Sequence, residues 1–222
     1  MNCPLVATFS LVARDPVTGN LGVAVASKFL AVGSIVPTAT AGVGAFASQA
    51  KSNTTFGPAA LRALAEGRTL ESIAADLAAS DAEYQHRQYG LVTAQGESYS
   101  HTGSACLAWA GGRTGPDYAA QGNILSGPEV LDALVDTWLA GTEMFPERLL
   151  TALAAADRAG GDSRGRQSAA LYVVGTGLGY GGRSDRWIDL RVDDHPQPIG
   201  ELERLLGVFR ATFAEPVRST SR

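Results

Sequence analysis

Residues 8–29 read TFSLVARDPVTGNLGVAVASKF, two runs of β-type residues on either side of a turn segment. The turn, residues 15–20, has Pro16 near its start and Gly19 near its end. Proline presets φ, and glycine tolerates the positive φ that a chain reversal needs. The sequence therefore predicts a β-hairpin near the start of the chain, with the hydroxyl residue Thr8 at the head of its first strand.

Composition predicts a soluble globular protein. The 222 residues are 45% hydrophobic and 18% charged, which is ordinary for a domain with one substantial core. The net charge of −4 argues against a nucleic-acid binder, because such proteins normally carry a basic surplus. No stretch approaches the roughly 20 apolar residues of a membrane span, and no basic residue precedes Arg14, as a signal peptide would require. Cys3 and Cys106 are too few and isolated for a disulfide framework, so we expect a cytoplasmic protein without nucleic-acid or membrane partners.

The order of predicted elements indicates the fold class. Periodicity and breaker residues predict short strands at 34–37 and 42–48, helices within 57–80, a hairpin at 88–93 and 98–101, a strand at 118–122, helices at 126–140 and 146–159, strands at 168–174 and 187–192, and a helix at 201–209. Strands and helices both arrive in pairs, unlike the alternation of a parallel βαβ sheet. We expect an α+β fold, a four-layer αββα sandwich of two antiparallel sheets with helix pairs outside. It forms one domain over residues 1–212, followed by a disordered tail at 213–222.

Five segments spread over most of the chain carry a family resemblance: Thr8–Pro16, Gly22–Lys28, Gln121–Leu125, Gly160–Ala170 and Arg191–Pro196. With the order of elements, they resemble the N-terminal-nucleophile (Ntn) hydrolase superfamily and, more closely, the family called domain of unknown function 1028. The resemblance implies the αββα sandwich and cleavage of an amide by an N-terminal nucleophile. It also implies a homo-oligomer, because members of the superfamily often assemble. The activity of the closer family is unassigned.

The resemblance makes Thr8 the candidate nucleophile, since such proteins begin their first strand with a threonine. A threonine at a free N-terminus uses its own α-amine as the base for its hydroxyl. Seven residues precede Thr8, so either the bond between Ala7 and Thr8 is cut, or the true start of the chain lies downstream, or the amine is never free. Cys3, a more reactive thiol, and Ser10, on the same strand face, stay open as alternatives. Thr8 is also compatible with a plain structural role, because threonine is common in strands.

A weaker similarity to proteasome β-type subunits implies supporting roles for other residues. Asp162, in the sequence DSRG, matches in kind the acidic residue that supports the nucleophile, although an ordinary ion pair with Arg164 or Arg166 is the alternative. Ser27 falls where those subunits carry an aspartate at the end of the second strand. The only two lysines, Lys28 and Lys51, are the candidates for an ammonium that keeps the nucleophile's amine deprotonated by like-charge repulsion.

The proposed acyl transfer also needs donors for the oxyanion. The small-residue segment 47–50, which includes Ser48 and Gln49, is a candidate source of backbone N–H groups, and Asn123 is a side-chain candidate. Gln167 is a further candidate for substrate binding, beside the common role of satisfying backbone groups at a strand start.

Two other motifs do not support a cofactor. Residues 177–182 fit the string G-x-G-x-x-G, but the following residues predict a strand where a dinucleotide site needs a helix. Asp194 and His195 precede Pro196 in a rigid loop without a second ligand cluster, so no metal site is expected. The sequence thus predicts a cofactor-free amidohydrolase of the Ntn type acting on a small amide or short peptide. The alternative is a non-catalytic binding protein of the same fold in which Thr8 is never freed.

Overall fold

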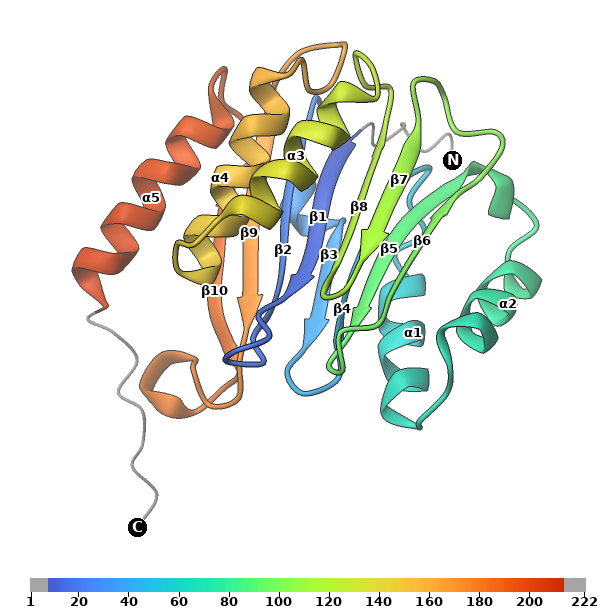
Figure 1. The fold of residues 1–222 in the computed structure, drawn as a ribbon, viewed down its shortest axis with the longest axis horizontal. Helices are drawn as coiled ribbons and strands as arrows, with labels where there is room; N and C mark the ends of the chain where they lie inside the picture. Colours follow the sequence, from blue (N-terminus) through green and yellow to red (C-terminus); the bar gives the residue numbers. More distant parts are fainter. Residues whose placement is uncertain (1–7, 214–222) are drawn as a thin grey trace.

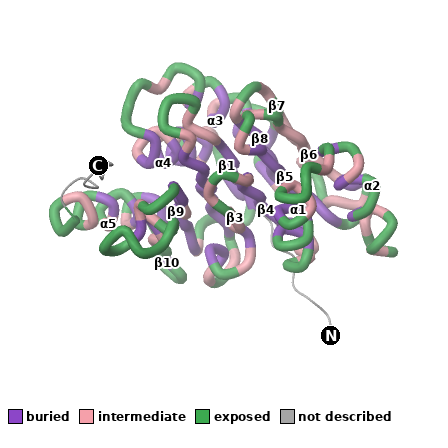
Figure 2. The backbone as a smooth tube through the Cα atoms, turned by 90° about the horizontal axis from the view of Figure 1, so that it is seen from below, coloured by how far each residue is buried: buried purple, intermediate pink, exposed green. Residues whose placement is uncertain are grey.

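The structure, a computed structural model, describes residues 8–213. Within this range two antiparallel sheets stack face to face, with helices outside both (Figure 1). Buried residues follow the strands through the middle of the molecule, and exposed residues follow the outer helices and loops (Figure 2). The predicted α+β class with two antiparallel sheets is therefore confirmed.

The larger sheet has the strand order β10-β9-β2-β1-β8-β7. Its strands are β1 (Thr8–Arg14), β2 (Leu21–Ser27), β7 (Gly111–Gly115), β8 (Tyr118–Asn123), β9 (Ser168–Val174) and β10 (Arg186–Val192). The predicted hairpin is β1 and β2, and Gly19 in its turn has a φ of 75°, as the reversal requires. Because β1 is central, Thr8 lies opposite Ser27 on one side and Asn123 on the other.

The smaller sheet has the strand order β3-β4-β5-β6. Its strands are β3 (Pro37–Thr40), β4 (Gly44–Ala50), β5 (Arg87–Thr93) and β6 (Ser98–Thr102). Alternation along β1 separates the two faces of the larger sheet: Phe9 and Leu11 pack toward the helices, whereas Val12 packs between the sheets. Thr8 and Ser10 have the parity of Val12 and therefore lie on the face between the sheets.

Helices α1 (Phe56–Ala65) and α2 (Leu70–Ser80) cover the smaller sheet, and α3 (Glu129–Ala140), α4 (Phe145–Arg158) and α5 (Pro198–Thr212) cover the larger one (Figure 1). Thr69 is the N-cap of α2, because its side chain accepts a hydrogen bond from the Ser72 N–H. The outer face of the larger sheet thus carries three helices in the described chain rather than a pair. The predicted tail at 213–222 lies outside the described residues apart from Phe213.

One predicted strand is wrong, and one observed strand was not predicted. The strand predicted at 34–37 is instead the short 3-10 helix η1 (Val32–Ser34) and its continuation, and β3 starts only at Pro37. Val32 and Val36 fill the core between the sheets, so these apolar residues signal burial and not a strand. Strand β7 was not predicted, because its sequence GGRTG contains hardly any β-forming residues. Gly112 allows close approach of the strands there, since a Cβ at this position would lie 2.4 Å from Ser100 Oγ on β6 unless that side chain moved.

Candidate functional site

Strands β1 and β2 bring two hydroxyl groups together at the end of the larger sheet where β1 begins and β2 ends. The antiparallel register pairs Thr8 with Ser27, and Thr8 Oγ1 donates a hydrogen bond to Ser27 Oγ over 3.2 Å. Thr8 is 0% exposed and Ser27 is 2% exposed. Asn123, opposite Thr8 on β8, completes a row of three polar side chains that share the inner face of the sheet. The hairpin alone therefore places the predicted nucleophile beside Ser27.

Asp162 is a buried carboxylate next to this pair. It comes from the loop between α4 and β9, and its side chain is only 1% exposed. Asp162 Oδ2 accepts hydrogen bonds from the backbone N–H of Lys28 over 2.9 Å and from Arg164 Nη2 over 2.9 Å. Oδ1 accepts from the N–H and from Nε of Arg164 over 3.0 and 3.1 Å. Charge-assisted bonds of this kind hold the carboxylate in one orientation, against the residue that follows Ser27.

The alternative for Asp162, an ion pair with a nearby arginine, is also present. Its partner is Arg164, and the pair differs from a solvated surface contact because the carboxylate is buried. Arg166 pairs with Asp157 instead, with Nε 2.8 and 2.9 Å from the two carboxylate oxygens. Asp162 can therefore hold the end of β2 through the Lys28 N–H and be charge-compensated by Arg164 at the same time.

Gln49 on β4 connects the smaller sheet to Thr8. Gln49 Nε2 donates to the carbonyl oxygen of Thr8 over 3.2 Å and to Gln88 Oε1 over 2.8 Å. Gln49 Oε1 accepts from Ser10 Oγ over 2.6 Å. Gln49 and Gln88 are both 0% exposed, so these bonds form away from water. Gln49, one of the predicted oxyanion donors, thus contacts Thr8, the predicted nucleophile. The contact is made by its side chain and not by the backbone N–H that was predicted.

The same hydrogen-bonded network extends along β8. Asn123 Nδ2 donates to Gln88 Oε1 over 2.9 Å, and Gln121 Nε2 donates to Ser10 Oγ over 2.5 Å. Gln121 Oε1 is buried without a hydrogen-bond partner in the described chain. The sequence reasoning missed Gln88 and Gln121. The available signal was a glutamine at an inward-facing position on two predicted strands, 88–93 and 118–122, where an apolar residue is the norm.

The ammonium groups of the two lysines bind other partners than Thr8. Lys28 Nζ donates to the backbone carbonyl of Arg166 over 3.2 Å, and the Lys51 ammonium forms an ion pair with Glu83. Neither ammonium contacts Thr8 in the structure described for residues 8–213. An ammonium beside the nucleophile is therefore not found at either predicted position.

The other two predicted donor and binding residues, Ser48 and Gln167, both donate their backbone N–H to a backbone carbonyl. The Ser48 N–H donates to the carbonyl of Val36 over 3.0 Å, so this backbone donor is already used. The Gln167 N–H donates to the carbonyl of Ser27 over 3.1 Å, and its side-chain Nε2 donates to Asp194 Oδ1 over 3.2 Å. Gln167 therefore joins the end of β2 to the loop that follows β10.

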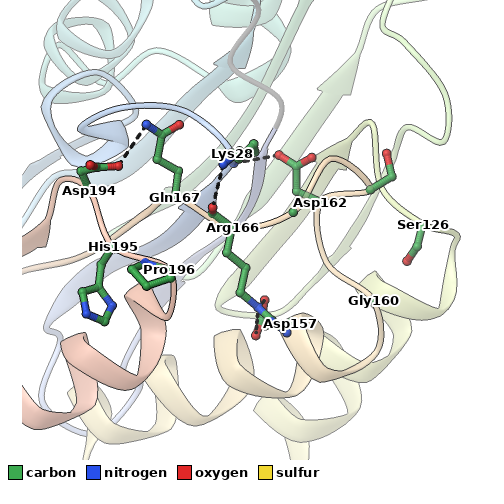
Figure 3. Close-up of a pocket in the computed structure, with 12 residues that line it drawn as sticks. Lys28, Ser126, Asp157, Gly160, Asp162, Arg166, Gln167, Asp194, His195 and Pro196 are labelled. Carbon is green, nitrogen blue, oxygen red and sulfur yellow. Dashed lines mark hydrogen bonds and ion pairs between the residues drawn. The ribbon is translucent and has the colours of Figure 1, made fainter.

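A cavity of about 730 Å³ opens beside Asp162 (Figure 3). Its lining residues are Lys28, Ser126, Asp157, Gly160, Asp162, Ser163, Gly165, Arg166, Gln167, Asp194, His195 and Pro196. The volume lies in the range of small-molecule sites. Since most of the lining is polar or charged, the cavity suits a small polar ligand. One lining residue, Lys28, directly follows the buried Ser27 in the chain.

The described residues contain neither a group of side chains suited to a metal ion nor a helix suited to cross a membrane. Over residues 8–213 there is no cluster of three or more His, Cys, Asp or Glu side chains that could hold a metal ion. His195 Nδ1 accepts the N–H of Gln197 over 3.0 Å, which engages one of its two ring nitrogens. In the same range none of the helices combines the length and the apolar character that a membrane crossing requires. Cys3, the rival nucleophile, lies outside the described residues.

Comparison with known proteins gives a family and a fold relative. The model of a family of unknown function (DUF1028) matches residues 8–202. Among solved structures, the crystal structure of protein SPO2555 from Silicibacter pomeroyi, a DUF1028 protein, is 32% identical in sequence and superposes with a TM-score of 0.83. The match covers 92% of this chain and 89% of that one. No curated protein matches the chain.

Proposed function

Because the chain belongs to the DUF1028 family, whose function is unknown, we propose its function from the site: hydrolysis of a small amide or peptide-like bond by Thr8, in the manner of an Ntn hydrolase. The observation that carries the proposal is the contact of 3.2 Å between Thr8 Oγ1 and Ser27 Oγ. It lies at paired strand ends beside the buried carboxylate of Asp162. The family match also begins at Thr8 itself.

The mechanism requires hydrolysis of the bond between Ala7 and Thr8, which frees the α-amine. That amine takes the proton from Thr8 Oγ1, directly or through water, as the oxygen forms a bond to the substrate carbonyl carbon. The amide C–N bond then breaks, and the leaving amine takes the proton from the Thr8 ammonium. Water adds to the resulting ester and releases the acid, which restores the threonine.

The surrounding residues support this chemistry through position. Ser27 Oγ accepts from the nucleophile's hydroxyl and orients it. Asp162 fixes the end of β2 through the Lys28 N–H, and Gln49 fixes the carbonyl of Thr8. Asn123 faces Thr8 across the ladder and uses Nδ2 for Gln88, which leaves one amide proton for an oxyanion. In comparable sites one such donor contributes about 3–4 kcal/mol.

The second candidate is the non-catalytic binding protein, and two observations favour it. Thr8 is 0% exposed, so a substrate cannot reach its hydroxyl without a change at the head of β1. The side chain on its carbonyl is the neutral amide of Gln49, not an ammonium. In this function the polar cavity beside Asp162 binds a ligand that the protein does not transform. The cytoplasmic location and the homo-oligomer remain predictions.

Intact mass and N-terminal sequencing of the purified full chain separate the two functions. The hydrolase proposal expects a chain that begins at Thr8 and that cleaves members of a panel of short peptides and amino-acid amides. Thr8→Ala should abolish both cleavage of the chain and turnover, whereas Thr18→Ala, a hydroxyl removed from the exposed hairpin turn, should alter neither. Turnover by a chain that retains residues 1–7 contradicts the mechanism. An uncleaved and inactive chain supports the binding protein.

A further inference from the structure

Most charges at the cavity beside Asp162 are compensated within the protein. Arg164 forms an ion pair with Asp162 (2.9 Å), and Arg166 forms one with Asp157 (2.8 Å). Each guanidinium donates at least two hydrogen bonds to its carboxylate. Asp162, Asp157 and Arg166 line the cavity, and these ion pairs leave little of their charge for a ligand to recognise.

Two charged side chains of the lining are different. Lys28 is exposed, and its ammonium donates only to the backbone carbonyl of Arg166 over 3.2 Å. Asp194 is exposed, and its carboxylate accepts from the neutral amide of Gln167 over 3.2 Å. In the part of the chain that the structure describes, Lys28 has no anionic partner and Asp194 no cationic one. The cavity therefore presents one uncompensated positive group and one uncompensated negative group.

The two groups lie on either side of Gln167 (Figure 3). Gln167 is held at both ends, by its N–H on the carbonyl of Ser27 and by its side chain on Asp194. The positions of the two charges are thus tied to one short segment of backbone at the start of β9. A ligand that bridges them needs an anionic and a cationic end within a small molecule.

We propose that this cavity binds a small zwitterion, an amino acid or a short peptide, with its carboxylate on Lys28 and its ammonium on Asp194. Charge-assisted hydrogen bonds at both ends are stronger than neutral ones, and the pair rejects ligands that lack either charge. His195 supplies a further donor: because Nδ1 accepts the Gln197 N–H, the proton of the neutral ring is on Nε2. The volume of about 730 Å³ accommodates a dipeptide.

This inference rests on the proposed function in so far as it makes the zwitterion the substrate. The cavity borders Asp162, which holds the backbone of Lys28 beside Ser27 and Thr8. A substrate anchored on Lys28 and Asp194 has both charged groups in the cavity, and its amide reaches the Thr8 hydroxyl after a change at the head of β1, because Thr8 is 0% exposed. Binding of the zwitterion itself does not depend on hydrolysis, so the two can be measured separately.

The test crosses ligand charge with residue charge, by calorimetry on the full chain. The probes are glycylglycine, glycylglycinamide, which lacks the carboxylate, and N-acetylglycylglycine, which lacks the ammonium. We expect the wild type to bind glycylglycine about tenfold or more tightly than either of the others. Lys28→Met should remove the preference over glycylglycinamide only, and Asp194→Asn should remove the preference over N-acetylglycylglycine only. Both substituted side chains are exposed, and thermal unfolding verifies that the variants fold.

Matched controls use like residues outside the cavity. Lys51→Met removes the other lysine, which pairs with Glu83, and Asp193→Asn changes the neighbour of Asp194; both should keep the wild-type preferences. Equal binding of the three probes, no binding of any, or a preference that survives the matching substitution overturns the inference. Mass spectrometry of the same samples reports hydrolysis. Selective binding without hydrolysis supports the zwitterion site and contradicts the hydrolase proposal. Hydrolysis without a charge preference supports the hydrolase proposal and contradicts the zwitterion site.

Discussion

The side-chain nitrogen of Gln49 lies 3.2 Å from the carbonyl oxygen of Thr8 and joins the two sheets beneath the candidate nucleophile. The same amide accepts from Ser10 and donates to Gln88, all in a region without exposure to water. Removing one member of such a buried network is costly, because its former partners lose a hydrogen bond in a place that water does not reach. The head of β1 is therefore positioned by the opposite sheet as well as by its own ladder.

Gln49→Leu should lower the free energy of unfolding by about 2–3 kcal/mol. Leucine has a similar size, but it removes the acceptor of the Ser10 hydroxyl and the side-chain donor to the Thr8 carbonyl, and each buried group that loses its partner costs about 1–3 kcal/mol. Gln88 Oε1 keeps the hydrogen bond from Asn123 Nδ2. Urea unfolding monitored by circular dichroism measures the change. Gln95→Leu, at an exposed turn residue, should stay within about 0.5 kcal/mol of the wild type. Equal stability of the two variants would mean that the network contributes nothing.

Asp162→Asn should destabilise the protein more than Asp157→Asn. Both carboxylates pair with an arginine at the same cavity, but the Asp162 side chain is 1% exposed and the Asp157 side chain 18%. Arg164 is partly exposed, which limits the loss to about 1–2 kcal/mol, whereas the more solvated pair should cost about 0.5 kcal/mol. Urea unfolding of both variants at pH 7 gives the comparison. The prediction fails if the order is reversed.

Part of the site followed from local sequence. The facing of Thr8 and Ser27 is a property of the hairpin, because the turn at 15–20 sets the register of β1 and β2. Asp162 was reached only through the family resemblance, and its burial could not be read from a loop sequence rich in glycine and arginine. The glutamine network depends on which faces of two sheets meet. Gln49 and Gln121 lie 72 residues apart, so periodicity along one strand cannot pair them.

The same distinction holds for the fold. Turns, caps and amphipathic helices have local causes, and the elements that contain them were predicted. The run at 34–37 is apolar because Val36 fills the core between the sheets, a role that a strand and a 3-10 turn can both satisfy. Strand β7 exists because β8 offers it a partner and because its glycines allow close approach to β6. Neither cause lies within the segment itself.

Acid should unfold the protein in part through Asp81. Hydrogen bonds from Arg87, with a smaller contribution from Asn53, lower the pKa of Asp81 from 3.8 to about 2 in the folded protein. Since the folded pKa is depressed, the stabilisation is complete above the unfolded value and is lost as the pH falls from about 4 toward 2. The difference amounts to about 2 kcal/mol.

Urea unfolding of the wild type and Asp81→Asn at pH 6 and at pH 2.5 measures this contribution. The two proteins should differ at pH 6 and converge by most of that amount at pH 2.5, because the wild-type carboxyl is then largely protonated in the unfolded chain. Asp76→Asn, which removes an exposed partner of Arg68, should run parallel to the wild type. A constant difference between wild type and Asp81→Asn at both pH values would contradict the assignment.

The close approach of β5 to β8 requires Gly90. A Cβ at this position would lie 1.9 Å from Gln121 Oε1, and that amide is held in place by Ser10. Gly90→Ala should therefore cost about 2 kcal/mol or more through overpacking. Gly200→Ala is the matched control, because Gly200 is in helix α5 and a Cβ added there would have no atom within 4 Å, so alanine should stabilise by about 0.5–1 kcal/mol. In a Gln121→Ala background the cost of Gly90→Ala should largely disappear. If it persists, the strain arises elsewhere than at the glutamine.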